Sequence, residues 1–203
     1  MSKFRCYSCG ITLNKENRSK EHIPPKILTN CLINKPTNNA TVKSCKNCNT
    51  QKSDLDFRYM LGILLTLPQE KINNTEIIRR IESDGKLKKF FLERDRNPEK
   101  PSEYRLCDKQ INFFTDIAKG IYYYDNKEVM PLASLCNLVF PEFYKLIQIN
   151  RDEYTSCNNV NFKNIHTDIL EYNITETDEQ IRLIIVLCRS VVVYLAYSKL
   201  DKG

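Results

Sequence analysis

Residues 40–54 read A-T-V-K-S-C-K-N-C-N-T-Q-K-S-D and contain a C-x-x-C pair, Cys45 and Cys48. A second pair, Cys6 and Cys9, lies near the start of the chain in the stretch C-Y-S-C-G. Together the two pairs supply four thiolates, the complete ligand set of a tetrahedral structural Zn²⁺ site. They are further apart than the roughly 15–20 residues common in zinc ribbons, which leaves room for a β-hairpin and a loop between them. We therefore expect a structural zinc ion to close a small N-terminal module and to contribute directly to its folding.

The positive charge of the chain is concentrated in the same region. The 203 residues include 31 Lys and Arg against 25 Asp and Glu, a net charge of +6. Residues 1–56 hold ten basic and four acidic side chains, whereas the remainder holds 21 of each. A surplus confined to one segment predicts a polyanionic partner there, although a solvated basic surface would give the same count. The 28% of charged and 41% of hydrophobic residues exclude collagen-like, coiled-coil and largely disordered classes.

The N-terminal sequence, the longest apolar stretch and the cysteine count together indicate the cellular compartment of the protein. The N-terminus has no apolar run after its first basic residues, so we expect no secretory signal. The longest apolar stretch, residues 181–197, contains Arg182 and Arg189 and is too short and too charged to span a bilayer. We therefore expect a cytoplasmic protein without a membrane partner, in which thiols stay reduced. The odd total of nine cysteines also argues against a disulfide framework.

The chain is expected to divide into two parts after residue 67. Residues 30–39 are rich in Asn, Pro and Thr and are predicted to form a loop. A helix is expected from about residue 45 to residue 67, where Pro68 would end it. We therefore assign residues 1–67 to a zinc-bound module and residues 68–203 to an accessory domain. The accessory domain would position substrate, bind a partner protein or form a homodimer.

The second part is predicted to combine helices with an antiparallel sheet. Residues 109–124 carry apolar side chains at helical spacing, and residues 132–146 show a weaker helical pattern that Pro141 interrupts. Three segments rich in Ile, Val, Leu and Tyr are predicted to be strands, residues 168–174, 181–188 and 191–198. A single buried helix over residues 181–197 is the alternative for the last two. The predicted fold class is α+β, with a small zinc-stapled module followed by a mixed helical and antiparallel-sheet region.

One of the two histidines lies inside the loop that the four cysteines would close. His22 stands next to Glu21 in the stretch K-E-H-I-P-P, residues 20–25. An isolated His is commonly a surface or core residue, but this one has an acidic neighbour and lies in the basic part of the chain. Asn49 and Lys52 follow the second cysteine pair and would share one helix face, because residues three apart are neighbours there.

These segments together resemble the HNH endonucleases, also called the ββα-metal nucleases. The resemblance rests on C-Y-S-C-G, on E-H-I-P-P and on N-N-A-T-V-K-S-C-K-N-C-N-T-Q-K-S-D. It is greatest with zinc-stapled bacterial members that read E-H-x-P-P-K and T-V-x-S-C-x-x-C-N, and it covers roughly residues 4–60. The stretch K-G-I-Y-Y at residues 119–123 is similar to a later segment of those members. The resemblance implies a zinc-closed ββα module in front of the α+β region.

The resemblance also implies a role for each matching residue. His22 corresponds to the general base that acts on water, and Glu21 to the acid that binds the catalytic divalent ion, where Asp is commoner. Asn49 corresponds to a second ligand of that ion, and Lys52 to a basic residue near the phosphate. The middle Asn of the motif matches less cleanly. Asn38 fits the E-H-x-P-P members best, whereas the usual spacing falls two residues later.

The chemistry of phosphodiester hydrolysis requires more than a base. An enzyme must supply much of roughly 20 kcal/mol, of which a positioned His contributes about 3–5 kcal/mol. A hard divalent ion, Mg²⁺ or Mn²⁺, is therefore expected beside the structural Zn²⁺. The expected substrate is nucleic acid, with DNA favoured over RNA. The candidate phosphate-binding residues are basic side chains around the motif, namely Lys20, Lys26, Lys43, Lys46 and Lys52.

Two other functions fit parts of the same pattern. A non-catalytic zinc module with a decayed HNH site would also bind nucleic acid or protein. A zinc nucleobase deaminase also uses Cys and Glu, but it requires H-x-E followed by P-C-x-x-C. Here Glu21 precedes His22 and no Pro precedes either C-x-x-C, so the deaminase is set aside. The endonuclease and the binding module remain as hypotheses, and a response of nucleic acid to divalent metal would distinguish them.

Overall fold

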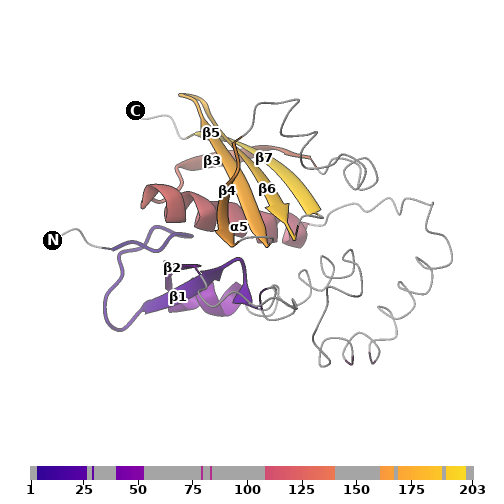
Figure 1. Ribbon diagram of the computed structural model, residues 1–203. Helices are drawn as coiled ribbons and strands as arrows, with labels where there is room; N and C mark the ends of the chain where they lie inside the picture. Colours follow the sequence, from indigo (N-terminus) through magenta and orange to yellow (C-terminus); the bar gives the residue numbers. More distant parts are fainter. Residues whose placement is uncertain are drawn as a thin grey trace.

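The chain folds around a helix that lies between two antiparallel sheets. The computed structural model describes residues 4–26, 29, 40–52, 79, 83, 108–139, 161–166, 169–188 and 191–199. Helix α5 (Asp108–Asn126) has the larger sheet on one side and the hairpin of β1 (Arg18–Ile23) and β2 (Ala40–Cys45) on the other (Figure 1). The fold is therefore mixed α+β, as the sequence predicts.

The hairpin forms the smaller sheet and leads directly into a helical segment. β1 and β2 pair antiparallel, so that Ser19 lies opposite Ser44 and His22 opposite Thr41. Residues 46–52 are helical and follow β2 without a break. This segment agrees with the first part of the helix predicted over residues 45–67, and residues 53–67 lie outside the described part of the chain.

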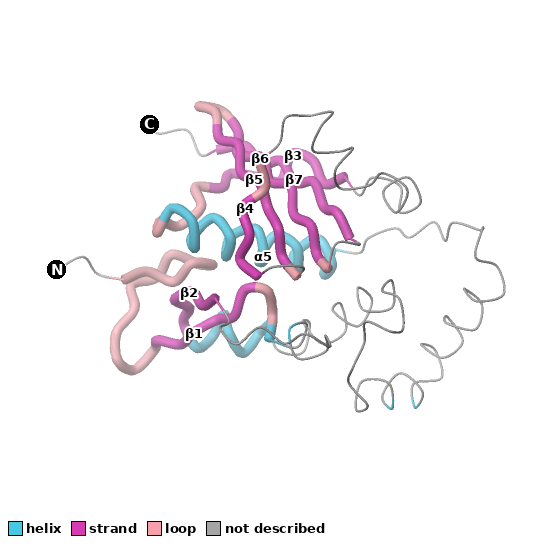
Figure 2. Tube along the Cα trace, viewed as in Figure 1, coloured by secondary structure: helices cyan, strands magenta, loops and turns pink. Residues whose placement is uncertain are grey.

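The larger sheet has five strands, all antiparallel to their neighbours, in the order β3-β7-β6-β5-β4 (Figure 2). The strands are β3 (Leu132–Val139), β4 (Lys163–His166), β5 (Leu170–Glu176), β6 (Gln180–Leu187) and β7 (Val191–Lys199). The three strands predicted for this region are confirmed as β5, β6 and β7. The alternative of one helix over residues 181–197 is wrong, because the many β-branched side chains there favour extended backbone.

The helix predicted over residues 132–146 is also wrong in its described part. Residues 132–139 form β3, which pairs with β7 and shows register shifts between Leu132 and Ser134 and between Leu135 and Asn137. Each shift places an extra residue on β3 and resets the two-residue alternation typical of a strand. The sequence pattern therefore repeats about every three residues and imitates a helix. Residues 140–146 lie outside the described part.

Helix α5 confirms the prediction over residues 109–124 and is buried on more than its predicted face. Phe114, Ile117 and Ile121 lie on the face that the apolar spacing predicts and are buried, and Phe113 and Tyr122 are buried as well. The reason is that α5 contacts both sheets and so has two apolar sides. None of the described helices combines the length and the hydrophobicity that a membrane-spanning helix requires.

The N-terminal segment and the larger sheet share one hydrophobic core. Tyr7, Ile23 and Val42 belong to the same buried cluster as α5 and strands β5 to β7. Gly120 permits the closest approach, because a Cβ at this position would overlap Ile23 Cδ1 and lie 3.4 Å from Tyr7 Cε2. The boundary expected at residues 67–68 lies outside the described residues, but the two regions on either side of it pack directly against each other.

Candidate metal centre and adjoining pocket

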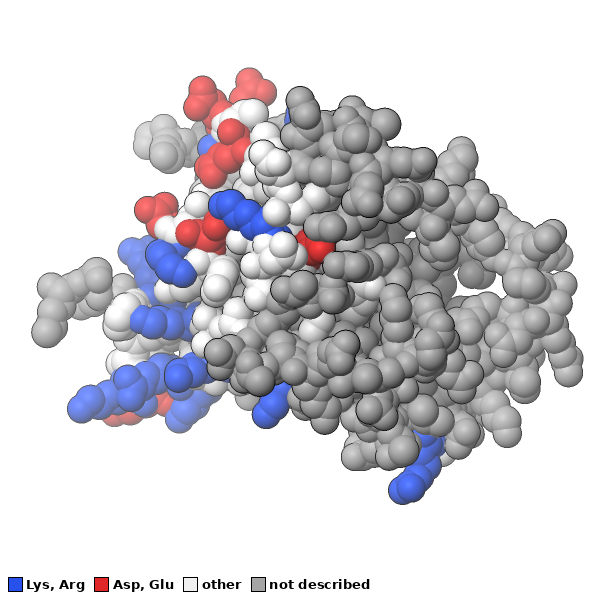
Figure 3. All heavy atoms as spheres, in the orientation of Figure 1, with Lys and Arg blue, Asp and Glu red and all other residues white. Residues whose placement is uncertain are grey.

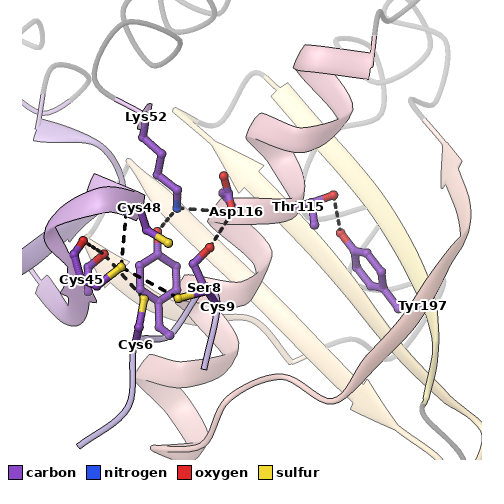
Figure 4. A network of polar contacts seen from close by, with 11 residues as sticks. Cys6, Ser8, Cys9, Cys45, Cys48, Lys52, Thr115, Asp116 and Tyr197 are labelled. Atoms are coloured by element: carbon purple, nitrogen blue, oxygen red, sulfur yellow. Dashed lines mark hydrogen bonds and ion pairs between the residues drawn. The ribbon is translucent and has the colours of Figure 1, made fainter. Parts of the chain in front are cut away.

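Four cysteine sulfurs meet where the N-terminal turn contacts the end of β2. Cys6 precedes a turn over residues 7–9 and Cys9 is its last residue, whereas Cys45 ends β2 and Cys48 lies in the following helical segment. Their Sγ atoms all lie within 4.8 Å of one another, and those of Cys9 and Cys45 are 3.9 Å apart (Figure 4). A zinc tetrahedron with Zn–S bonds of about 2.3 Å has S···S edges of about 3.8 Å. The four cysteines are therefore close enough to bind one zinc ion, as their spacing predicts.

Backbone hydrogen bonds hold the first cysteine pair in place. The Gly10 N–H donates to the Cys6 carbonyl at 2.9 Å, and the Cys6 N–H donates to the Ile11 carbonyl at 2.9 Å. Gly10 has a φ of 73°, a left-handed conformation that glycine adopts without steric cost. The Tyr7 N–H donates to the Lys43 carbonyl at 3.0 Å and joins this turn to β2. The turn is thus fixed against the strand that carries the second pair.

The protonation of the cluster favours a bound cation. Burial tends to raise the pKa of the Cys6 thiol, but backbone N–H groups of Cys9, Cys45 and Ser8 outweigh it and lower this pKa to about 7. The pKa of Cys48 is raised, first by burial and then by the neighbouring cysteines. One thiolate therefore forms readily, and further thiolates at this distance are opposed by their neighbours. A divalent cation would remove that opposition, because thiolates are its ligands.

A small pocket beside the metal centre gathers several of the predicted site residues. Glu21, His22 and Lys52 all line it, and the other lining residues are Tyr7, Ile23, Pro25, Phe113, Asp116 and Ile117. The pocket therefore has walls from β1, from the helical segment 46–52 and from α5. Three predicted site residues with ionisable side chains therefore line one pocket at the place where the N-terminal segment meets the helix.

His22 is suited to accept a proton. Its pKa is lowered from the ordinary value, first by burial and then by the positive charges of Lys26 and Lys20. The imidazole is therefore neutral at neutral pH. Its Nδ1 atom is buried and has no hydrogen-bond partner among the described residues. Buried polar atoms normally have a partner, so this nitrogen marks a place where a water or a ligand would be bound.

Lys52 is held by internal contacts. The residue is 8% exposed, and its Nζ bonds to the Tyr7 hydroxyl and lies 3.4 Å from Asp116 Oδ1 (Figure 4). The Ser8 hydroxyl donates to the same Asp116 oxygen at 3.3 Å. Sequence reasoning missed this network, because no local pattern relates position 116 on α5 to position 52. The network ties the metal centre to α5.

Asn49 lies on the Glu21 side of the hairpin. Its Nδ2 donates to the Ser19 hydroxyl at 2.9 Å, and Ser19 and Glu21 share a face of β1 because side chains alternate along a strand. The remaining amide atom, Oδ1, is the one that could contact a cation. Asn38, the expected middle Asn of the motif, lies outside the described residues.

The candidate phosphate-binding lysines differ in exposure. Lys20, Lys26 and Lys46 are exposed, whereas Lys43 is half-buried with its Nζ over the ring of Phe4. In Figure 3 the Lys and Arg side chains gather over the β1–β2 hairpin, and most Asp and Glu side chains lie further up, over the larger sheet. On the face shown in Figure 3, the described basic side chains are therefore concentrated at the hairpin, in the same region as the basic surplus of the sequence.

The Lys52–Asp116 pair is expected to contribute measurably to the free energy of unfolding. Asp116→Asn removes the charge that faces a buried ammonium group, so we expect the free energy of unfolding to fall by about 1–3 kcal/mol in chemical denaturation. The matched control is Lys163→Gln, which removes an ion pair between Lys163 and Asp125 at 2.6 Å whose lysine is 61% exposed. That change should cost less than about 1 kcal/mol. Equal losses in the two variants would contradict a structural role for the Lys52–Asp116 pair.

Comparison with protein-family models, with curated proteins and with solved structures finds no match to this chain. The described residues form two features with recognisable chemistry, the four-cysteine cluster and the pocket lined by Glu21 and His22.

Proposed function

We propose that the protein is a metal-dependent endonuclease of the HNH type that hydrolyses phosphodiester bonds of nucleic acid. The observation that carries the proposal is the pocket that Glu21 and a neutral His22 both line, beside a four-cysteine cluster. The order of elements supports it, because the β1–β2 hairpin followed by the helical segment 46–52 agrees with a ββα arrangement. The motif resemblance favours DNA over RNA as the substrate.

In this proposal His22 is the general base. A neutral imidazole accepts a proton from water and so produces a stronger nucleophile for attack on phosphorus. Positioned proton transfer of this kind contributes about 10²–10⁴-fold to a rate. Burial, and after it the positive charges of Lys26 and Lys20, lower the pKa of His22, and the two lysines would also attract the phosphate backbone of a substrate.

The residues present also fit a hard divalent ion separate from the cysteines. The Glu21 carboxylate and the Asn49 amide oxygen are the oxygen ligands that Mg²⁺ and Mn²⁺ prefer, and few protein ligands are needed because Mg²⁺ retains several waters. When bound, such an ion neutralises charge on a phosphate oxygen and stabilises the leaving oxygen. The cysteine cluster has a different role, since four thiolates saturate a zinc ion and leave no open position.

A non-catalytic module that binds nucleic acid or protein is the second candidate. The observation that favours it is that Lys52 and Asn49 are both engaged inside the protein, with Asp116 and Ser19 respectively. In that case Lys52 would hold α5 in place and would not contact phosphate. The larger sheet and α5 would position substrate, bind a partner protein or form a dimer under either candidate.

Variants of the two proposed ion ligands test the proposal. Glu21→Gln and Asn49→Ala should each slow Mg²⁺-dependent cleavage of plasmid, single-stranded DNA or tRNA. High Mn²⁺ should restore part of the activity, because Mn²⁺ tolerates poorer coordination. The control is Ser83→Ala, a change on a helical residue remote in sequence from the pocket. Wild-type protein that binds these substrates but never cuts them with Mg²⁺ or Mn²⁺ would exclude the enzyme and favour the binding module.

A further inference from the structure

An aromatic ring is exposed on the basic surface of the hairpin. Phe4 is 56% exposed and Ile11 is 48% exposed, and they are the only large hydrophobic side chains exposed to this degree among the described residues. The Lys43 ammonium lies over the Phe4 ring. The hydrogen bond from the Tyr7 N–H to the Lys43 carbonyl fixes the segment after Phe4 along β2. The ring is thus held beside β2 and not inside the core.

Two lysines face each other directly next to this ring. Lys20 on β1 and Lys43 on β2 are register partners, and like charges placed directly opposite across a sheet destabilise it. His22 follows Lys20 by two positions, so it lies on the same face of β1. Phe4, Lys43, Lys20 and His22 therefore form a row across the hairpin, which we call the Phe4–His22 row. An anion bound along this row would relieve the repulsion between the lysines.

We propose that the Phe4–His22 row binds single-stranded nucleic acid, with an unpaired base stacked on Phe4 and the adjoining phosphates on Lys43 and Lys20. The inference rests on the proposed nuclease function and deepens it by naming the substrate as a single strand that runs toward His22. Lys43 covers one face of the ring, and the exposed area of Phe4 leaves surface for a base. The surplus of basic residues also lies in this part of the chain, and it complements the negative charge of the phosphates.

Stacking explains why the strand should be single. In a duplex the faces of each base are covered by its neighbours, so a protein ring can stack only on a base that is unpaired. Aromatic stacking tolerates any sequence because every base has a π-face, and basic side chains add a salt-dependent term. A phosphate-only interface would need no exposed ring. Unpaired DNA and unpaired RNA offer the same two groups, so the experiment includes both.

Binding is measured without added Mg²⁺ or Mn²⁺, so that no cleavage is required. The probes are a fluorescein-labelled oligothymidylate, an oligouridylate of the same length and a blunt DNA duplex of that length. Phe4→Ala should weaken binding of the single strands by about 5- to 150-fold, the range measured for loss of one stacked base. The matched control is Ile11→Ala, which removes the other exposed apolar side chain and should change binding less than twofold.

A tryptophan at the same position gives a second readout that does not depend on affinity. The chain contains no Trp, so Phe4→Trp introduces a single indole fluorophore. Its emission should be quenched when oligothymidylate binds and should change much less with the duplex. Equal quenching by single strand and duplex would overturn the proposal.

The lysines are tested through salt dependence. Lys20→Gln should reduce the slope of log binding constant against log salt by about 0.7, the value for one phosphate contact with a single strand. Arg182→Gln, at an exposed position on β6, should leave the slope unchanged. An unchanged slope for Lys20→Gln, or unchanged affinity for Phe4→Ala, would overturn the proposal even if the protein cleaves nucleic acid. Conversely, a protein that binds single strands through Phe4 but shows no metal-dependent cleavage would support this inference and contradict the proposed nuclease function.

Discussion

The double variant Cys45→Ser, Cys48→Ser is expected to lose its bound zinc and to unfold the segment that contains the hairpin. Among the described residues of this segment, the apolar side chains that belong to the shared core are Tyr7, Ile23 and Val42. Structural zinc contributes on the order of 10–16 kcal/mol to folding in small zinc peptides, which is as large as the whole stability of a typical domain. Metal analysis of protein purified without added zinc should give close to one equivalent for the wild type and almost none for the variant.

The control for this variant is Cys188→Ser. Cys188 is also buried, but it follows β6 in the larger sheet and is not part of the cluster. It should keep the full equivalent of zinc. A Cys45→Ser, Cys48→Ser protein that retains both its zinc and its melting temperature would show that the four sulfurs do not hold a structural metal.

His22→Ala is expected to reduce metal-dependent cleavage by about 10²–10⁴-fold, because it removes the base that takes the proton from water. The variant should keep its zinc, since His22 is not one of the four cluster residues. It should also keep its fold, because the imidazole is only half-buried and its Nδ1 has no partner among the described residues. The loss is measured as a single-turnover rate at saturating Mg²⁺.

Thr41→Ala is the matched control for His22→Ala. Thr41 is the register partner of His22 on β2 and is exposed, so its replacement alters the same part of the hairpin but leaves the proposed base in place. Cleavage at the wild-type rate is expected from this variant. If the His22 variant cleaves as fast as the Thr41 variant, the proposed mechanism is wrong.

The cysteine cluster is the part of the site that the sequence predicts best. A C-x-x-C turn brings two sulfurs together through local backbone geometry, and only the meeting of the two turns depends on the rest of the fold. The strands β5, β6 and β7 are predictable for a similar reason, because segments rich in Ile, Val, Leu and Tyr favour extended backbone. Helix α5 follows from its regular apolar spacing.

The parts that the sequence does not reveal depend on contacts between distant residues. The bulges of β3 are set by its pairing with β7, and they disguise a strand as a helix. The second buried side of α5 exists because Tyr7 and Ile23 reach it across a long separation in sequence. The Lys52–Asp116 pair has the same origin, and it gives Lys52 an internal partner that motif matching cannot detect.

Single-turnover incubation of zinc-loaded wild-type protein with a labelled single strand, with and without Mg²⁺ or Mn²⁺, decides whether the protein is a metal-dependent nuclease. We expect cleavage that requires the added ion and is lost in His22→Ala protein from a parallel preparation. A strand that is bound but stays intact at every concentration of both ions would show that the protein is not a nuclease of this kind.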